Sequence, residues 1–267
     1  SGTTDDRVWL CSPETAAAAA LTGRITDPRD LPDLLGIGYP VLGLPQTAGV
    51  NTAMLEPPPP AAEASTVTLV KAPSIGSLPE LDPLPDNLTA RVVIKVGDNV
   101  STDDILPAGA QALPYRSNIA RLAEFAFSRV DPGYPERARQ AGQHIIVAGA
   151  NYGQGSSREH AAIAPRYLGL RLVVAKSYAR IHWQNLANFG ILPLQFTEEA
   201  DYDHIAPGDE LGVDGLHGAL GGGIEITLRN LTRGTTYLTR HRLSPRQVAM
   251  ILAGGQIPRL RRTSTER

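Results

Sequence analysis

An apolar run, a glycine-rich turn and a helical pattern follow one another without a gap in the middle of the chain. The run 144–148, His-Ile-Ile-Val-Ala, has the length and composition of a buried strand. The turn at 149–158 contains three glycines, a helical pattern covers 159–168, and a second apolar run follows at 171–176. Strands that alternate with helices in this way predict right-handed crossovers and a largely parallel sheet.

The neighbouring sequence extends this pattern into one domain, predicted over residues 89–258. Further strands are predicted at 91–96, 191–196, 210–213, 224–231 and 236–240. Further helices are predicted at 119–128, 177–188 and 244–253, with Ser177 as a cap. Gly-rich turns separate the last three strands and predict antiparallel pairing. The predicted fold class is therefore α/β with a partly parallel sheet, followed by a charged, loose tail at 259–267.

Two different kinds of sequence precede this domain. Residues 12–23 predict a helix, with Ser12 as the N-cap, Pro13 at the first helical position and Gly23 as the left-handed C-terminal cap. Residues 27–88 are rich in Pro, Gly and Ala, contain four consecutive prolines and lack sustained periodicity. They predict a long and partly extended linker.

Composition argues against several classes of protein. The formal net charge of -2 argues against a broad basic face for nucleic acid. No apolar run approaches the roughly 18 residues that a membrane span needs, and the polar N-terminus shows no secretory signal, so we expect a soluble protein. The only cysteine, Cys11, excludes an internal disulfide framework and fits a reducing compartment. One thiolate also cannot build a metal cluster or a zinc site on its own.

Residues 149–160 predict an anion-binding site. The glycines leave backbone N–H groups unpaired and let a ligand approach the main chain closely. Ser156 and Ser157 add two hydroxyls, and Arg158 adds a guanidinium at the start of the helix, where the helix dipole favours an anion over a cation. Carboxylates or phosphate are the expected ligands. In the structural alternative, Ser156 and Glu159 form a capping box that only satisfies the first free amides.

Residues 100–118 form the second candidate segment. It contains the adjacent carboxylates Asp103 and Asp104, and Arg116 follows closely. Aspartates of this kind can face a ligand, or they can form a turn by binding their own backbone. Arg116 taken alone would be a solvated charge, so the residues of this segment leave both interpretations open.

The remaining polar residues of the domain do not form a ligand set. The spacing of His160, His182 and His204 is not typical of metal ligands, and we assign no metal to them. Arg180 and Trp183 lie in a helical pattern, where surface or core positions are expected.

Several motifs in a fixed order resemble the aconitase family. Four of these motifs are similar to the C-terminal swivel domain of that family, at residues 101–105, 151–162, 177–186 and 190–194. Asp104 stands where that family usually has histidine in a Thr-Asp-His-Ile block. Residues 11–14 are similar to the stretch that closes the family's iron–sulfur core domains. The resemblance covers nearly all of 90–255 and the first helix.

The resemblance implies a swivelling β/β/α-type domain at 89–258, preceded by the end of the core domain at 1–26. It implies that citrate is converted to isocitrate through cis-aconitate. A [4Fe–4S] cluster, held by the core domain and not by this chain, would act as a Lewis acid on the departing hydroxyl. The implied partners are the aconitase core domains, in the same polypeptide or a separate subunit, and a tricarboxylate. The expected location is the cytoplasm, or the mitochondrial matrix in a eukaryote.

The resemblance also implies roles for five residues. Ser156 matches the base that removes the proton from carbon as an alkoxide, and Asp103 matches a carboxylate that orients its neighbours. Arg158 matches a ligand of a substrate carboxylate, and Ser157 matches its hydrogen-bonding partner. Arg116 matches a further arginine that contacts the substrate. A gap in the match after Gly109 leaves the alignment of this arginine open by about one position. A helix N-terminus and a guanidinium would supply the positive potential that a serine alkoxide needs.

Two alternatives remain open. The substrate can be a related acid, namely isopropylmalate, homocitrate or methylcitrate. The leading helix and the linker favour a fused aconitase, and Arg116 favours citrate if it meets the third carboxylate. A different class of function is a non-catalytic module that binds carboxylates or a partner protein.

Overall fold

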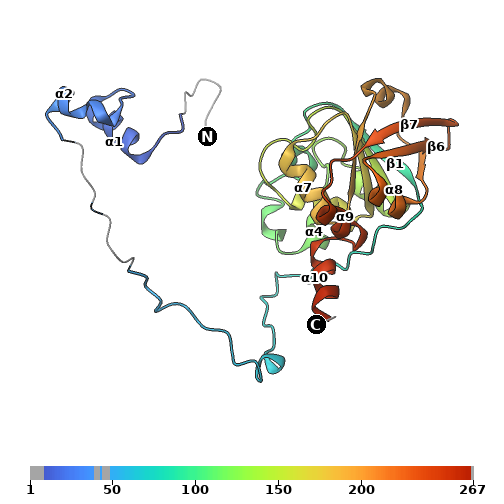
Figure 1. Ribbon diagram of the computed structural model, residues 1–267, viewed down its shortest axis with the longest axis horizontal. Coiled ribbons are helices and arrows are strands. Elements are labelled where there is room, and N and C mark those ends of the chain that lie inside the picture. Colours follow the sequence, from blue (N-terminus) through green and yellow to red (C-terminus); the bar gives the residue numbers. More distant parts are fainter. Residues whose placement is uncertain (1–8, 39–42, 44–48, 266–267) are drawn as a thin grey trace. The chain divides into compact units, whose positions relative to one another are not determined.

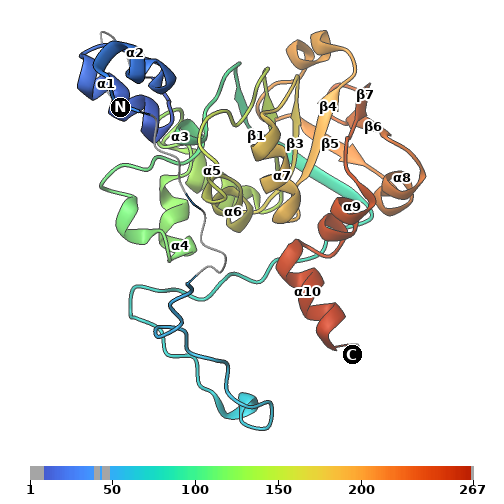
Figure 2. The ribbon, with the colours of Figure 1, turned by 60° about the vertical axis from the view of Figure 1, so that its left-hand side comes forward.

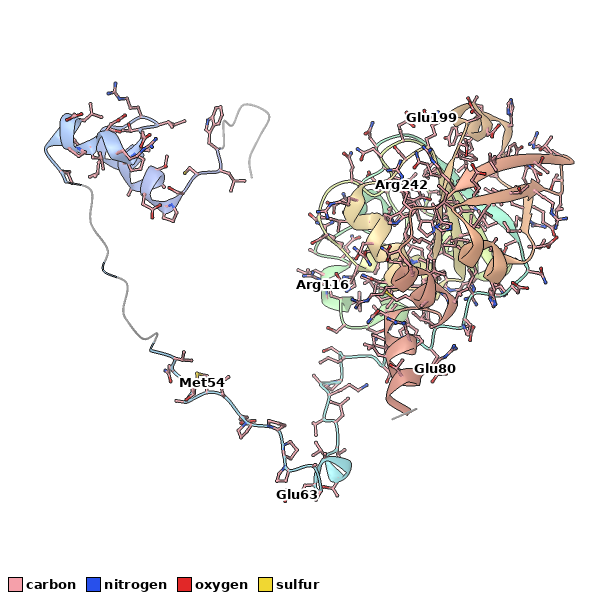
Figure 3. All side chains as sticks on the ribbon, viewed as in Figure 1. Met54, Glu63, Glu80, Arg116, Glu199 and Arg242 are labelled. Carbon is pink, nitrogen blue, oxygen red and sulfur yellow. The ribbon has the colours of Figure 1, made fainter. Side chains whose placement is uncertain are left out.

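The computed structural model describes residues 9–38, 43 and 49–265, and it divides into two compact units, residues 1–68 and 69–267. All the strands of the described residues belong to the second unit (Figure 1). Figure 3 shows how densely side chains fill this unit, whereas Met54 of the first unit is 93% exposed. Among the described residues, no helix is both long enough and apolar enough to cross a membrane.

The first unit contains the predicted helix. Helix α1 (Pro13–Thr22) begins after Ser12, whose hydroxyl accepts a hydrogen bond from the Thr15 N–H at 3.2 Å. It ends at Gly23, which has φ +70° and donates its N–H to the Ala19 carbonyl. Local cap chemistry therefore specifies both ends of this helix.

The segment predicted as linker, 27–88, contains more structure than expected. Its regular elements before the second unit are η1 (Pro28–Asp30), α2 (Leu31–Leu35) and η2 (Ala64–Thr66). The Asp27 carboxylate accepts the Arg29 N–H at 2.9 Å, and prolines occupy early helical positions where their fixed φ suits a helix. At its other end, Leu84 is 1% exposed and packs in the core of the second unit.

Seven strands of the second unit form a closed barrel in the order β1-β2-β3-β4-β7-β6-β5, in which β5 also pairs with β1 (Figure 2). The strands are β1 (Leu88–Val96), β2 (His144–Ala148), β3 (Leu170–Ala175), β4 (Leu192–Phe196), β5 (Glu210–Val213), β6 (Glu225–Asn230) and β7 (Thr235–Arg240). Neighbours among β1 to β4 pair in parallel, and the remaining pairs are antiparallel. The α/β class with a partly parallel sheet is confirmed.

Short helices cover and connect these strands. They are α3 (Thr102–Ile105), η3 (Leu113–Tyr115), α4 (Ile119–Leu122), η4 (Ala123–Phe125), α5 (Tyr134–Ala141), α6 (His160–Tyr167), α7 (Arg180–Asn188), η5 (Glu199–His204), α8 (Leu216–Gly222), α9 (Pro245–Leu252) and α10 (Gln256–Thr265). The helix expected at 119–128 is thus broken into α4 and η4.

Two predictions about helix ends differ from the structure. Ser177 does not cap α7, which begins at Arg180, because the Ser177 hydroxyl instead accepts the Asn151 N–H at 2.8 Å. The tail predicted to be loose is helical as far as Thr265. Gly254 and Gly255, with φ of +93° and +137°, reverse the chain so that α10 packs against α9.

The core lies on both faces of the parallel strands. Ile146 and Ala148 of β2 belong to one hydrophobic cluster, whereas Ile145 and Val147 belong to the other. Successive side chains of a strand point to opposite faces, so a strand that is covered on both sides is apolar throughout. This explains why the run at 144–148 contains no exposed residue.

Candidate functional site

The glycine-rich turn (149–159) lies between two segments that follow neighbouring strands. On one side, the Gly153 N–H donates to the Val100 carbonyl at 2.8 Å. On the other side, the Tyr152 N–H donates to the Ser177 carbonyl at 3.0 Å. These segments follow β1, β2 and β3, which are parallel neighbours, so their carboxyl ends meet at one edge of the sheet. In α/β proteins, both barrels and open sheets, ligand sites form at the carboxyl ends of parallel strands.

The two adjacent aspartates have different partners. The Asp104 carboxylate accepts hydrogen bonds from the backbone N–H and the hydroxyl of Ser101, at 2.9 and 2.7 Å, and completes a capping box for α3. Asp103 instead forms a salt bridge with Arg158, and it also accepts the Ala108 N–H at 3.4 Å. Asp104 is therefore structural, and Asp103 faces the glycine-rich turn.

The Asp103–Arg158 pair is partly exposed, with 42% of the aspartate side chain and 24% of the arginine side chain accessible. The hydrogen bond from Arg158 lowers the pKa of the Asp103 carboxyl below its usual value, against the effect of burial. An ionised Asp103 consequently holds the guanidinium of Arg158 in one orientation beside the turn.

Ser156 lies in the exposed part of the turn, and its backbone is fixed from two sides. Its carbonyl accepts the Thr102 hydroxyl at 3.1 Å and the Arg158 N–H at 2.8 Å. The hydroxyl of Ser156 forms none of the hydrogen bonds found among the described residues. It is therefore available to a ligand at a fixed place next to Arg158.

The capping box between Ser156 and Glu159, which was the structural alternative to an anion site, does not form. Helix α6 begins at His160, Glu159 occupies its N-cap without a side-chain hydrogen bond, and Arg158 precedes the first turn. Gly155, with φ +98°, and the hydrogen bonds to the Ser156 carbonyl direct the chain away from a helical path before residue 159. The turn therefore projects its serines beyond the helix.

Arg116 approaches the same place from η3. It lines a small cavity together with Arg158 and His160, and the His160 Nε2 is 3.0 Å from the Arg116 carbonyl oxygen. The cavity measures about 30 Å³, which is about the volume of one water molecule. A tricarboxylate would have to bind above it, on an open surface.

The structure therefore brings together Asp103, Ser156, Arg158 and Arg116. Ser157 is exposed in the same turn. Sequence reasoning missed Thr102, which is 2% exposed and anchors the turn through its hydroxyl. For Asp104, the alternative in which an aspartate binds its own backbone is correct, and the Ser-x-x-Asp spacing of 101–104 signals this cap.

A second missed residue is His182, on α7. A side chain added at Gly153 would place its Cβ 2.2 Å from two ring atoms of His182, so only glycine fits beneath this ring. His182 is 1% exposed, and neither ring nitrogen has a hydrogen-bond partner. Burial lowers its pKa to about 4, which keeps the ring neutral.

The residues of this chain do not fit an iron–sulfur cluster. Cys11 is the only cysteine, and it is exposed in the first unit. In the part of the chain that the structure describes, no group of three His, Cys, Asp or Glu side chains could hold a metal ion. A cluster that works with this chain would have to be bound by another domain or subunit.

Comparison with known proteins identifies the family of this chain. The profile of the aconitase C-terminal domain matches residues 131–199, which include the turn. The 3-isopropylmalate dehydratase small subunit 2 of Archaeoglobus fulgidus is 43% identical over 140 residues, which are 52% of this chain and 75% of that protein. The chain belongs to the aconitase family.

Other family members match different lengths of the chain. The mitochondrial aconitate hydratase of Saccharomyces cerevisiae is 33% identical over 268 residues, covering 85% of this chain and 33% of that protein. A solved 3-isopropylmalate dehydratase from Methanocaldococcus jannaschii superposes with a TM-score of 0.56 at 29% identity, covering 67% of this chain and 96% of that one. This chain spans a third or less of the aconitate hydratases that it matches.

Proposed function

We propose that this chain is the swivel half of an aconitase-type hydro-lyase that converts citrate to isocitrate through cis-aconitate. The observation that carries the proposal is the arrangement around Ser156. Its exposed hydroxyl lies in a fixed turn beside the Asp103–Arg158 pair, at the carboxyl edge of the parallel strands. Abstraction of a proton from the carbon next to a carboxylate requires a base, a cation that binds the carboxylate and room for the substrate. The alcohol, the oriented guanidinium and the open space match these three requirements.

In the proposed reaction, Ser156 takes the proton from the substrate carbon. A free serine hydroxyl is a very weak base, so its deprotonated form needs positive potential. Arg158 and the N-terminal end of α6 supply it, and both effects strengthen once docking of a partner excludes water. Arg158 also binds a substrate carboxylate, as paired N–H donors of arginine suit this group, and Ser157 supports that contact.

The open surface supports a half-site that a partner completes. The cavity beside Arg158 has room for about one water molecule. We therefore infer that core domains, in the same polypeptide or a separate subunit, cover the tricarboxylate and carry the [4Fe–4S] cluster. In this proposal the core domains, and not this chain, assist the departure of the substrate hydroxyl. The single cysteine fits a reducing compartment, either the cytoplasm or the mitochondrial matrix.

Citrate is the proposed substrate because of Arg116. It lines the cavity next to Arg158, where it can meet a third carboxylate. The match to the yeast aconitate hydratase also extends over 85% of this chain, including sequence that the small-subunit relatives do not match.

Isomerisation of a related acid is the second candidate. It is favoured by the 3-isopropylmalate dehydratase small subunit 2 of Archaeoglobus fulgidus and the homoaconitase small subunit of Thermus thermophilus, which are 43% and 41% identical in the regions that they match. Steady-state kinetics of the complete enzyme on citrate, homocitrate, methylcitrate and isopropylmalate separate the two. A kcat/KM that is highest for an acid other than citrate would overturn the citrate assignment.

Replacement of Ser156 by alanine tests the proposed base. In the complete enzyme we expect Ser156→Ala to lower kcat by about 10³-fold or more and to change KM little, because the hydroxyl acts on the reacting carbon. Ser74→Ala, at an exposed serine outside the site, is the control and should retain normal turnover. Near-normal turnover of Ser156→Ala would remove this residue from the role of base.

A further inference from the structure

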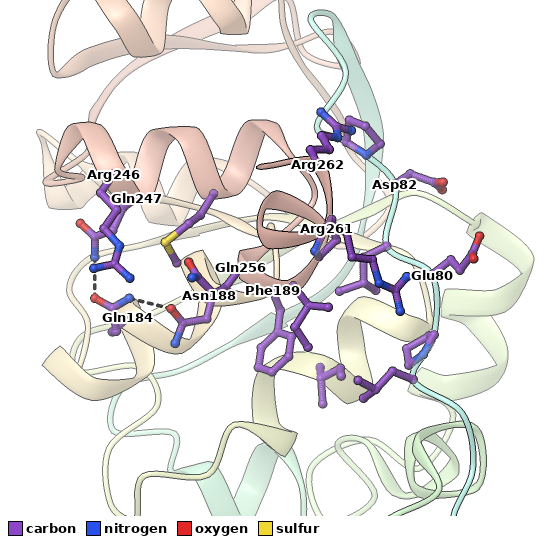
Figure 4. Close-up of a pocket in the computed structure, with 18 of the residues that line it drawn as sticks. Glu80, Asp82, Gln184, Asn188, Phe189, Arg246, Gln247, Gln256, Arg261 and Arg262 are labelled. Atoms are coloured by element: carbon purple, nitrogen blue, oxygen red, sulfur yellow. Dashed lines mark hydrogen bonds between the residues drawn. The ribbon is translucent and has the colours of Figure 1, made fainter. Parts of the chain in front are cut away.

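A pocket of about 900 Å³ lies in the second unit (Figure 4), and no residue of the glycine-rich turn lines it. Helices α7, α9 and α10 form three of its sides, and an extended segment that we call the strap (78–83) forms another. Neither Ser156 nor Arg158 lines it. Its volume is in the upper part of the range of about 300–1,000 Å³ that is typical of small-molecule sites.

Buried arginines hold two walls of the pocket in place. The Arg166 guanidinium donates to the Asp82 carbonyl of the strap at 2.8 Å and to the Phe189 carbonyl at 3.2 Å. Arg171 donates to the same Asp82 carbonyl at 3.1 Å. Arg166 and Arg171 are only 4% and 5% exposed, so these bonds are well shielded from water. These bonds therefore hold the strap and the chain after α7 in place without a ligand.

One end of the pocket presents a chain of side-chain amides. The backbone N–H of Ser244 donates to the Gln247 Oε1 at 2.8 Å, and the Gln247 amide donates to the Gln184 Oε1 at 2.7 Å. The Gln184 amide then donates to the Asn188 Oδ1 at 2.7 Å (Figure 4). All the bonds run in one direction, so they polarise one another and end in the two N–H donors of Asn188.

The charges of the pocket are distributed unevenly. Arg246 lies at the end that carries the amide chain, whereas the two carboxylates that line the pocket, Glu80 and Asp82, belong to the strap at the other end (Figure 4). The two other arginines of the lining, Arg261 and Arg262, belong to α10 and lie on the side of these carboxylates. Arg246 is exposed and forms none of the salt bridges found among the described residues. The N-terminus of α9 adds positive potential at the same end. This end is therefore suited to an anion that accepts hydrogen bonds.

The pocket is partly apolar. Ile163, Phe189 and Met250 line it, and the aromatic ring of Phe189 offers a surface on which a planar group can stack. A small inorganic anion would leave this surface uncovered, and an uncharged apolar molecule would leave the donors unpaired. We propose that the pocket binds a mononucleotide, with its phosphate at Arg246 and Asn188 and its base against Phe189.

Titration calorimetry of the 267-residue chain with ADP tests this proposal. We expect saturable binding of ADP, and binding of adenosine and of inorganic phosphate that is weaker by about tenfold or more, since each lacks one half of the contacts. Arg246→Gln should weaken ADP binding by about tenfold. Asn188→Asp, which places a carboxylate where the donors are, should weaken it at least as much.

Arg242→Gln is the matched control, because it removes the same charge from an exposed residue that does not line this pocket. It should change ADP affinity by less than about twofold. Thermal unfolding of each variant checks that the fold is retained. The proposal is overturned if ADP fails to saturate at millimolar concentration, if adenosine or citrate binds as tightly as ADP, or if Arg242→Gln weakens ADP as much as Arg246→Gln. None of these outcomes depends on hydro-lyase activity.

Discussion

At the scale of single residues, the site depends on which of two adjacent carboxylates is free to face it. Asp103 and Asp104 have the same chemistry, but Asp104 is bound to the backbone and hydroxyl of Ser101. Asp103 is left to bind Arg158, which lies 55 positions away in the chain. The pairing fixes the guanidinium that we propose as a substrate ligand.

This pairing leads to a prediction about titration. Because Arg158 is the main cause of the lowered pKa of Asp103, Arg158→Gln should raise that pKa toward the ordinary value of an aspartate. Carbon-detected NMR of the carboxyl group during a pH titration measures it. Asp131, whose pKa is lowered mainly by Arg137, is an internal control and should not change. An unaltered Asp103 titration would mean that the pair does not form in solution.

Gly153 is the second residue on which the turn depends. It has φ +79°, and its missing side chain leaves room for the ring of His182. We expect Gly153→Ala to lower the free energy of unfolding by about 2 kcal/mol or more, from backbone strain and overpacking together. Chemical denaturation measures the loss.

Gly221→Ala is the control for this substitution, because Gly221 lies in helix α8 with open space around it. Alanine favours a helix interior, so this variant should be as stable as the parent chain or more stable. Equal stability of the Gly153→Ala and Gly221→Ala chains would show that the turn can move away from His182.

At the scale of elements, the site is built from loops rather than from the helices that adjoin them. The segments after β1, β2 and β3 meet at one edge because these strands are parallel neighbours. Helix α6 contributes its N-terminal end, and α7 places His182 beneath the turn. Ser156 and Ser157 are exposed and the Asp103–Arg158 pair is partly exposed, whereas Thr102 and His182, which contact the turn from below, are buried.

The burial of His182 predicts how stability depends on pH. Its pKa is about 4 in the folded chain and about 6.5 in an unfolded one. Between these values the unfolded state binds a proton that the folded state does not, so stability falls as pH falls from about 6.5 to 4. The His182 contribution amounts to about 3 kcal/mol across this window.

Replacement of His182 by leucine tests this contribution. The loss of stability between pH 6.5 and 4 should be smaller in His182→Leu than in the parent chain, as measured by denaturant unfolding at each pH. His204→Leu, at an exposed histidine, is the comparison and should retain the parent slope more closely. If both variants have the parent slope, His182 is not buried as a neutral ring in solution.

At the scale of the whole molecule, the division of the chain does not follow its composition. The Pro-rich sequence continues past residue 68, yet residues from 69 onward belong to the second unit. The strap supplies the Asp82 carbonyl that Arg166 and Arg171 require, and Leu84 enters the hydrophobic core. The buried arginines therefore tie a segment of linker-like sequence to the barrel.

Truncation tests this division. Residues 69–267 should fold as an independent domain, because both hydrophobic clusters lie within them. A chain of residues 85–267 lacks the Asp82 carbonyl and the buried Leu84. It should be less stable by about 3 kcal/mol or more, since buried guanidiniums lose their acceptor. Equal melting temperatures of the two fragments would show that the strap does not stabilise the barrel.

The sequence alone determined the features that depend on near neighbours. The strands at 144–148 and 171–176, both ends of α1 and the location of the glycine-rich turn follow from side-chain periodicity and cap chemistry within a few residues. Closure of the barrel, the pairing of Asp103 with Arg158, and the packing of His182 on Gly153 were decided only by the tertiary structure. They depend on contacts between residues that are far apart in the chain, and no local pattern contains that information.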